Sequence, residues 1–320
     1  MTIRELDKKY FSKIDYLDLE MIISHVIKKT RSFILAHPEY ELTAMQLKKT
    51  ESFLKRRIKY EPLAYILGYK EFYGLEFKVN KNVLVPRPET ELIIDEVLKS
   101  LTPSIPLISP SRLENEAEGT KEKPPLDKGG YKSTMIIDVG TGSGCIITTL
   151  AKLAPFNKGG AGDFEFFAID ISPKALMIAK QNAKKHNVSN KLKFFKGNLL
   201  EPILKNKKLK IENCKLIITA NLPYLTPKQI KESPTIKREP RLALVAGHDG
   251  LKYYKKLIGQ IRQLKNLRPD THITIFCEID HTQTGNFKKL IKKELPGAGT
   301  EVLKDMHCLD RLVRIGLSPF

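Results

Sequence analysis

The chain has 320 residues, enough for two domains, and 41% of them are hydrophobic, which is enough to build buried cores. No apolar run approaches about 18 residues and the four cysteines are scattered, so we expect no membrane span, no metal site and a cytoplasmic location. The net charge of +19 is spread along every segment without a patch of basic and aromatic residues, so direct nucleic-acid binding is not expected.

The N-terminal residues, 1 to about 70, are predicted to form a small helical domain. Apolar residues between Leu19 and Ile27 recur at helical spacing, and Thr43 with Gln46 forms a capping box before a further helix. Such a bundle has too small a core to be an enzyme alone. It is therefore expected either to bind a partner or to act as a stabilising cap on a catalytic domain.

Residues 71–85 alternate between apolar and polar side chains, which predicts a hairpin linker between the two domains. The Pro-Arg-Pro segment 86–88 is stiff and extended, and it precedes a helix that starts near Glu89. Its prolines are expected to hold Arg87 and Thr90 at the mouth of a pocket as substrate-binding residues. An ordinary helix start with an exposed arginine has the same pattern.

Two segments interrupt the pattern of predicted elements. Residues 102–134 carry five prolines and no periodicity, and they predict a disordered insertion. A shorter, glycine-rich stretch at 155–163 is a second insertion. We expect both to lie at the surface, where added sequence is tolerated.

The remaining sequence alternates between strands and helices. Strands are predicted near 135–139, 164–170, 191–196, 214–220 and 272–279, followed by a last pair near 299–304 and 311–316. Alternation over this length predicts the α/β class, with a doubly wound and mostly parallel seven-stranded sheet. Residues 86–320 are therefore expected to form one α/β domain.

A glycine-rich turn follows the first of these strands and leads into a helix. It consists of Gly140, Thr141, Gly142, Ser143 and Gly144. Glycines allow close approach of a ligand, and the helix N-terminus behind them favours a polar or anionic group. The G-x-G-x-G spacing differs from that of dinucleotide-binding loops and suits a carboxylate-bearing nucleoside as well. The next strand ends at Asp170, an acid placed to accept both ribose hydroxyls.

The strand at 216–220 is followed by Asn221, Leu222, Pro223 and Tyr224. Asparagine offers one acceptor and two donors, Pro223 favours an extended Leu222 whose carbonyl can face a pocket, and Tyr224 supplies a flat face. These groups suit a planar substrate group that carries –NH₂, such as an amide or a nucleobase amine. Asparagine and proline are also common in turns, so the segment by itself is equally typical of a plain strand end. The glycine turn, Asp170 and this segment, in that order, indicate an S-adenosylmethionine-dependent methyltransferase.

The chain resembles the protein-(glutamine-N5) methyltransferases that modify peptide-chain release factors, the HemK/PrmC family. The resemblance is most specific in residues 62–68 (PLAYILG), 71–74 (EFYG) and 83–91 (VLVPRPETE), and it covers nearly the whole chain apart from the two insertions. It implies a Rossmann-like methyltransferase domain with a terminal antiparallel hairpin and a helical domain that helps to bind release factors. The implied reaction is methyl transfer from S-adenosylmethionine to the glutamine of their Gly-Gly-Gln motif.

The resemblance also implies roles for the site residues. The glycine turn would line the methionine portion of the cofactor, Asp170 would hold the ribose, and Asn198 with Leu199 would flank the adenine. Asn221 is also expected to contact the cofactor. Asn221 and Leu222 would accept the two protons of the substrate amide through their side-chain and backbone oxygens. Tyr224 would pack on the plane of that amide. We expect the chain to act as a monomer.

Two departures from the family pattern keep other functions open. Family members commonly have an acid at position 198 and proline at position 222, where this chain has Asn198 and Leu222. The sequence Asn-Leu-Pro-Tyr is typical of ribosomal RNA adenine N6-methyltransferases, and a glutamine methyltransferase that acts on a ribosomal protein is a further alternative. The string at 86–91 argues against both. The intact glycine turn and Asp170 argue against a fold that has lost its activity and only binds a partner.

Overall fold

The computed structural model describes residues 1–101, 131, 133–154, 163–206, 209, 214–232 and 236–318. The predicted insertion at 102–134 lies outside the described residues except at positions 131, 133 and 134, and the last two belong to a strand. The predicted insertion at 155–163 also lies outside them, except for residue 163, which begins another strand.

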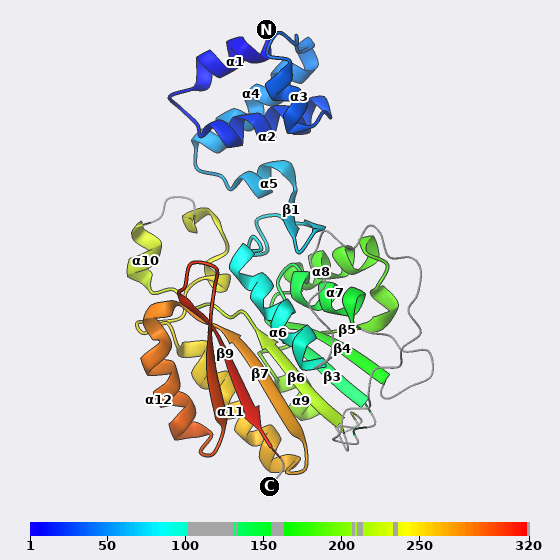
Figure 1. Cartoon of the computed structure of the whole chain (residues 1–320), viewed down its shortest axis with the longest axis vertical. Coiled ribbons are helices and arrows are strands. Elements are labelled where there is room, and N and C mark those ends of the chain that lie inside the picture. The colour runs from blue at the N-terminus through cyan, green and yellow to red at the C-terminus, as the bar shows by residue number, and fades with distance from the viewer. Residues whose placement is uncertain are drawn as a thin grey trace.

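A group of short helices opens the chain and lies at one end of the molecule (Figure 1). They are α1 (Ile3–Tyr10), α2 (Tyr16–Ile27), α3 (Arg31–Ala36), α4 (Ala44–Ile58) and α5 (Leu63–Leu67). Their apolar side chains form a separate hydrophobic cluster that includes Leu6, Ile22 and Leu54. The predicted capping box is confirmed, because Thr43 and Gln46 each accept the backbone N–H of the other at the start of α4.

An antiparallel hairpin connects these helices to the rest of the chain. It is formed by β1 (Tyr69–Phe72) and β2 (Leu75–Lys78), whereas the hairpin linker was predicted over residues 71–85. Asn182, on helix α8 (Pro173–Lys185), binds the backbone of Lys78 on both sides, accepting its N–H at 2.8 Å and donating to its C=O at 3.0 Å. The same amide donates to the C=O of Ser143 at 2.8 Å, so one side chain joins the hairpin to the glycine turn.

The centre of the molecule is a seven-stranded sheet with the order β5-β4-β3-β6-β7-β9-β8. Its strands are β3 (Ser133–Val139), β4 (Asp163–Asp170), β5 (Leu192–Lys196), β6 (Cys214–Ala220), β7 (His272–Glu278), β8 (Gly299–Lys304) and β9 (Asp310–Leu317). All neighbours are parallel except β9, which runs antiparallel to β7 and β8. The predicted fold class, a mostly parallel sheet with a terminal antiparallel pair and an N-terminal helical segment, is confirmed.

Helices cover both faces of this sheet (Figure 1). One face packs against α6 (Glu91–Leu101), α7 (Cys145–Leu153) and α8, and the other against α9 (Glu201–Lys205), α11 (Lys252–Leu267) and α12 (Thr284–Glu294). Successive side chains of a strand point to opposite faces, so Ile136 and Ile137 of β3 belong to different hydrophobic clusters. The short elements are η1 (Pro88–Thr90), η3 (Ser189–Lys191), α10 (Pro227–Glu232), η4 (Ile236–Arg238), η5 (Arg241–Ala243) and η6 (His281–Gln283).

The order of the strands fixes where a ligand can bind. From β3 the chain moves outward to β4 and β5, and it then returns to place β6 on the other side of β3. The connections after β3 and β6 therefore leave in opposite directions, and a crevice opens between the carboxyl ends of these two strands. The limits of the two domains remain a prediction.

Candidate active site

A cavity of about 220 Å³ lies at the carboxyl ends of β3, β4 and β6. The parallel register pairs Val139 with Ile169 on one side and with Ala220 on the other. The residues that follow these three strands are therefore brought to one edge of the sheet. This edge carries the glycine turn, Asp170 and Asn221, which the sequence analysis singled out.

The glycine turn is held in place by a buried carboxyl group, that of Asp138 on β3. Asp138 accepts hydrogen bonds from the hydroxyls of Thr141 at 2.6 Å and of Thr219 at 2.8 Å. Burial raises the pKa of Asp138 to about 6, against the opposing effect of these two hydroxyl donors. Gly140 has a φ of 74°, and a Cβ there would come within 2.9 Å of the Leu222 side chain, so the turn and the segment after β6 are in contact.

Asp170 has both carboxylate oxygens tied to backbone N–H groups. One oxygen accepts from Gly142 at 2.9 Å and the other from Ser172 at 2.8 Å. Burial raises the pKa of Asp170, and the backbone N–H groups of Ser172, Gly142 and Ile171 act against that rise. A carboxylate offers about four lone-pair sites, so Asp170 keeps acceptor capacity for a ligand on the cavity side.

The loop after β5 lies beside Asp170 and is fixed by a glutamine of α11. The Gln260 side chain accepts from the N–H of Leu200 at 2.8 Å and donates to the C=O of Asn198 at 3.2 Å. Leu199 between them has a φ of 58°, a conformation that is unfavourable for a residue with a branched side chain. This conformation, and the Gln260 bonds on either side of it, place Asn198 and Leu199 on the cavity wall.

Asn221 projects from the end of β6 and donates a hydrogen bond from its Nδ2 to the Thr90 hydroxyl at 2.9 Å. The N–H of Leu222 points away from the cavity, toward the Tyr254 hydroxyl at 3.4 Å. Tyr254 is buried in the core and also donates to the backbone C=O of Glu278. The segment after β6 is therefore anchored by η1 on one side and by α11 and β7 on the other.

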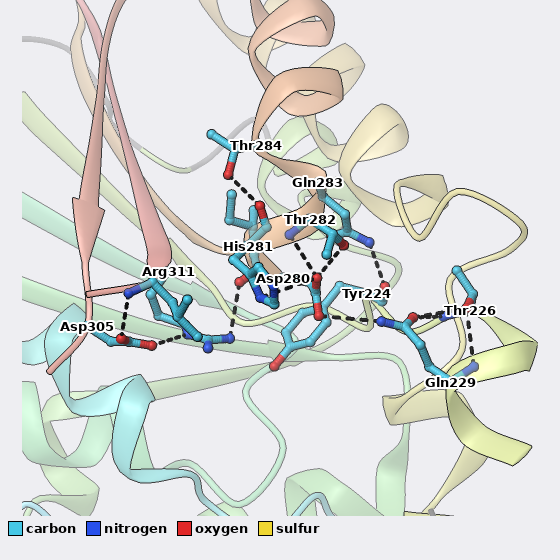
Figure 2. A network of polar contacts seen from close by, with 12 residues as sticks. Tyr224, Thr226, Gln229, Asp280, His281, Thr282, Gln283, Thr284, Asp305 and Arg311 are labelled. Carbon is cyan, nitrogen blue, oxygen red and sulfur yellow. Dashed lines mark hydrogen bonds and ion pairs between the residues drawn. The ribbon is translucent and has the colours of Figure 1, made fainter. Parts of the chain in front are cut away.

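Tyr224 is part of a polar network that joins several loops (Figure 2). Its backbone C=O accepts from Nε2 of Gln283 at 2.7 Å, and its hydroxyl donates to Oε1 of Glu278 at 3.2 Å. Gly250 lies against the hydrogen bond between Gln283 and Tyr224. A Cβ at Gly250 would be 1.9 Å from Nε2 of Gln283 and 2.3 Å from the Tyr224 carbonyl oxygen. The backbone at Tyr224 is therefore closely packed on two sides. Burial raises the pKa of the Tyr224 hydroxyl, with Glu278 adding to the effect.

Arg87 stands at the rim of the cavity and forms an ion pair with Glu239, at 2.5 Å. The other carboxylate oxygen of Glu239 accepts the N–H of Val85 at 3.0 Å. Glu239 is buried, whereas the Arg87 side chain is 34% exposed. The segment before η1, which forms one wall of the cavity, is thus fixed to the segment after η4.

The structure brings most of the predicted site residues together on the cavity wall. Those lining it are Arg87, Thr90, Gly140, Thr141, Gly142, Ser143, Asp170, Asn198, Leu199, Asn221, Leu222 and Pro223. Two others lie outside the lining: Gly144 caps α7 and packs against Ala179, and Tyr224 is bound to Glu278. The roles of Asp138, Glu239 and Glu278 were not predicted from the sequence.

Two further observations on the described part of the chain concern metal ions and membranes. Within it, no group of three or more histidine, cysteine or acidic residues is placed to hold a metal ion. None of the helices in the same residues is both long and apolar enough to cross a membrane.

The fold and the residues at its sheet edge define a Rossmann-like methyltransferase. Comparison with protein families agrees with this class: residues 131–294 match a methyltransferase domain, and residues 2–68 match the PrmC N-terminal domain. The catalytic domain of hMettl16 in complex with MAT2A 3'UTR hairpin 1 has the same fold, with a TM-score of 0.51 and 13% identity over 87% of this chain and 82% of that one.

The chain belongs to the release factor glutamine methyltransferases. It is 35% identical to the release factor glutamine methyltransferase of Thermodesulfovibrio yellowstonii over 97% of this chain and 95% of that protein. It is also 38% identical to a bifunctional methyltransferase of Rickettsia bellii, over 75% of this chain but only 41% of that longer protein. The chain is therefore an enzyme of the methyltransferase class, and the family resemblance inferred from the sequence is confirmed.

Proposed function

We propose that this chain transfers a methyl group from S-adenosylmethionine to the side-chain amide nitrogen of the glutamine in the Gly-Gly-Gln motif of peptide-chain release factors. The observation that carries this proposal is the shared cavity edge. There, Asn221 and Leu222 stand beside the glycine turn and Asp170. An acceptor pair for an –NH₂ group and a nucleoside site thus occupy one cavity.

The residues of the cavity fit S-adenosylmethionine. Asp170 keeps acceptor capacity for a ribose hydroxyl. A Cβ at Gly142 would meet nothing closer than the Gly140 carbonyl at 3.8 Å, so the turn leaves room for a ligand. Leu199 and Ile171 supply apolar contacts for a base. When bound, the cofactor supplies a methyl group activated by a positively charged sulfur.

The chain itself must orient the accepting nitrogen, because the lone pair of an amide is delocalised and reacts poorly. Asn221 donates a hydrogen bond from Nδ2 to the Thr90 hydroxyl, which leaves Oδ1 to accept a hydrogen bond from the substrate amide. The Leu222 carbonyl accepts the other, since Pro223 favours an extended backbone at Leu222. Two fixed acceptors hold the nitrogen toward the methyl donor and stabilise the positive charge that develops on it.

Tyr224 receives a different role in this proposal from the one predicted from sequence. Packing on the substrate amide requires a ring face on the cavity wall, and Tyr224 is not among the lining residues. Its hydroxyl is bound to Glu278 and its carbonyl to Gln283. We therefore assign Tyr224 the positioning of the Asn221–Pro223 segment.

The test uses purified chain and S-adenosylmethionine labelled on the methyl group. Release factor, ribosomal protein and ribosomal RNA are offered separately, together with a release factor whose Gly-Gly-Gln glutamine is replaced by alanine. We expect label on intact release factor only, and mass spectrometry should locate it on that glutamine. Label on the ribosomal protein or on RNA alone would contradict the proposal and support one of the two alternatives considered above.

The same proposal names the partner and its setting. Release factor is the protein substrate, and the N-terminal helices, which match the PrmC N-terminal domain, are proposed to contribute to its binding. We expect the chain to work as a monomer in the cytoplasm. Gel filtration with light scattering, with and without release factor, measures the stoichiometry, and a stable dimer without substrate would contradict this part.

A further inference from the structure

Glu278 is a buried carboxyl group for which the mechanism above has no use. It ends β7 and is 1% exposed. Its Oε1 accepts the Tyr224 hydroxyl at 3.2 Å, whereas Oε2 is buried and has no hydrogen-bond partner among the described residues. A buried carboxylate oxygen without a donor is costly, so a nearby group with a proton to give is expected to use it.

Thr90 is the residue with such a proton. It is 2% exposed, and its oxygen already accepts Nδ2 of Asn221 at 2.9 Å, so its own proton is left to donate elsewhere. Ala220 pairs with Cys277 in the parallel register of β6 and β7, so Asn221, which is bonded to Thr90, and Glu278 are the next residues on neighbouring strands. The Thr90 hydroxyl lowers the pKa of the Glu278 carboxyl, as Tyr224 and Arg311 also do, while burial raises it and is the largest effect. Asn221, Thr90 and Glu278 thus lie together between the cavity and the core.

The direction of hydrogen-bond donation among these three residues decides what Asn221 presents to the cavity. The two ends of an asparagine amide have the same shape, but one is an acceptor and the other a double donor. With the amide reversed, Nδ2 would face the substrate –NH₂, and two donors would oppose each other. An ionised carboxylate is an acceptor only, so it can impose one direction on the hydroxyl beside it.

We propose that Glu278 is a positioning residue that acts through Thr90: it accepts the Thr90 proton on Oε2, which makes Thr90 an acceptor for Nδ2 and turns Oδ1 of Asn221 toward the substrate amide. The inference rests on the proposed function, because it assigns Oδ1 to the accepted –NH₂ group. Thr90, which was predicted from the sequence to bind substrate, instead links Glu278 to Asn221 in this proposal.

Three single variants test this proposed chain of hydrogen bonds. Thr90→Val keeps the shape of the side chain without its hydroxyl, and Thr90→Ser restores the hydroxyl. Glu278→Gln keeps the volume, but its amide NH₂ can face Thr90 and reverse the direction of donation. We expect kcat to fall about 10- to 100-fold in Thr90→Val and Glu278→Gln, with the cofactor Kd unchanged within about threefold. Thr90→Ser should keep kcat within about threefold of that of the unmodified chain.

The double variant separates a shared path from two independent effects. If Glu278 acts through Thr90, adding Glu278→Gln to Thr90→Val should change kcat no further. Multiplied losses in the double variant would overturn the proposal, as would a Thr90→Val enzyme with the kcat of the unmodified chain. Thermal unfolding identifies variants that do not fold. If Glu278→Gln is among them, the Thr90 pair and the measurement below decide.

A readout without turnover keeps this inference apart from the proposed function. The side-chain ¹⁵N–¹H signals of Asn221 can be identified by their loss in Asn221→Asp. Their protons should exchange slowly with solvent in the unmodified chain and faster in Thr90→Val and Glu278→Gln. Unchanged exchange would overturn the inference even if release factor is methylated. If the unmodified chain methylates no release factor, the proposed function fails, while the exchange rates still report on the hydrogen-bonded chain.

Discussion

Arg87 and Glu239 are paired across the rim of the cavity although 152 residues separate them in the sequence. The arginine belongs to the segment before η1 and the glutamate to the segment after η4. Among the described residues, the buried carboxylate is hydrogen-bonded by this cation and by the N–H of Val85. The pair therefore fixes two loops to each other where a substrate would enter.

The partners of this pair should differ in how much they matter for stability. Arg87→Met leaves a buried carboxylate without its counter-ion, and we expect the free energy of unfolding to drop by about 3 kcal/mol. Glu239→Gln leaves an arginine that can reach water and keeps an oxygen for Val85, so a drop of about 1 kcal/mol is expected. The exposed pair Lys185–Glu76 is the control, where Lys185→Met should cost less than about 1 kcal/mol. Urea unfolding measures all three, and equal losses for Arg87→Met and Glu239→Gln would contradict the argument.

Replacement of Asp170 should weaken cofactor binding specifically. Asp170→Asn puts a donor where Gly142 or Ser172 needs an acceptor, and it removes lone pairs from the cavity side. We expect the Kd for S-adenosylmethionine to rise about tenfold or more, measured by isothermal titration calorimetry. Glu165→Gln, on the exposed part of the same strand, is the matched control and should leave the Kd unchanged. Equal Kd values for the two variants would refute the assignment.

Loss of the Asn221 side chain should affect the chemical step rather than binding. Asn221→Ala removes one of the two acceptors for the substrate amide, so kcat is expected to fall about 100-fold or more. The cofactor Kd should change by less than about threefold, because Asp170 and the glycine turn are untouched. Asn190→Ala, in the exposed helix η3, should retain full activity. Rapid-quench measurement of single turnovers checks this, and normal turnover by Asn221→Ala would rule out the mechanism.

Gly250 should tolerate no side chain. Its φ is +68°, and a Cβ would collide with Nε2 of Gln283 at 1.9 Å and with the Tyr224 carbonyl at 2.3 Å. We expect Gly250→Ala to destabilise the fold by about 2–3 kcal/mol. It should also lower kcat, because displacing Tyr224 moves the Asn221–Pro223 segment. In contrast, Gly259 lies inside α11 with nothing within 4 Å, and Gly259→Ala should stabilise the chain by about 0.5–1 kcal/mol. Thermal unfolding of the two variants should shift in opposite directions.

The buried Asp138 should make stability depend on pH below neutrality. In the folded chain its carboxyl keeps its proton up to about pH 6, whereas in the unfolded chain it loses the proton near 3.8. The folded state binds more protons between these values, so this contribution is complete below about pH 4 and is lost as the pH rises through about 6, a change on the order of 3 kcal/mol. Asp138→Asn should remove that slope, while the exposed Asp270→Asn should keep it. Unfolding free energies measured from pH 4 to 7 would show parallel curves for Asp138→Asn and the unmodified chain if the idea is wrong.

The sheet and much of the site edge were predictable because their signals are local. A buried parallel strand is a short apolar run, and β6 covers the residues predicted for it, 214–220. The glycine turn, Asp170 and Asn221 each follow such a run directly, and parallel strands bring their carboxyl ends to one edge. Position along the chain was therefore enough to place them near one another.

The supporting carboxyl groups were not predictable for the opposite reason. Glu239 lies in an irregular segment, and nothing local connects it with Arg87 far earlier in the chain. Asp138 and Glu278 stand inside or at the end of apolar strands, where the sequence alone does not say which hydroxyls meet them. The orientation of Tyr224 was not predictable either, because it depends on contacts with Gly250 and Gln283, which lie much later in the chain.

Asn182 sets a rule for recombining this protein with its relatives. Its amide forms hydrogen bonds with the N–H and C=O of Lys78 on β2, not with the lysine side chain. It also donates a hydrogen bond to the C=O of Ser143 in the glycine turn. A chimaera that imports residues 1–78 from another species can therefore differ freely in the side chains of the hairpin, provided that its main chain follows the same course. Loss of the asparagine on the recipient side would uncouple the imported module from the catalytic half, however similar the two donors are.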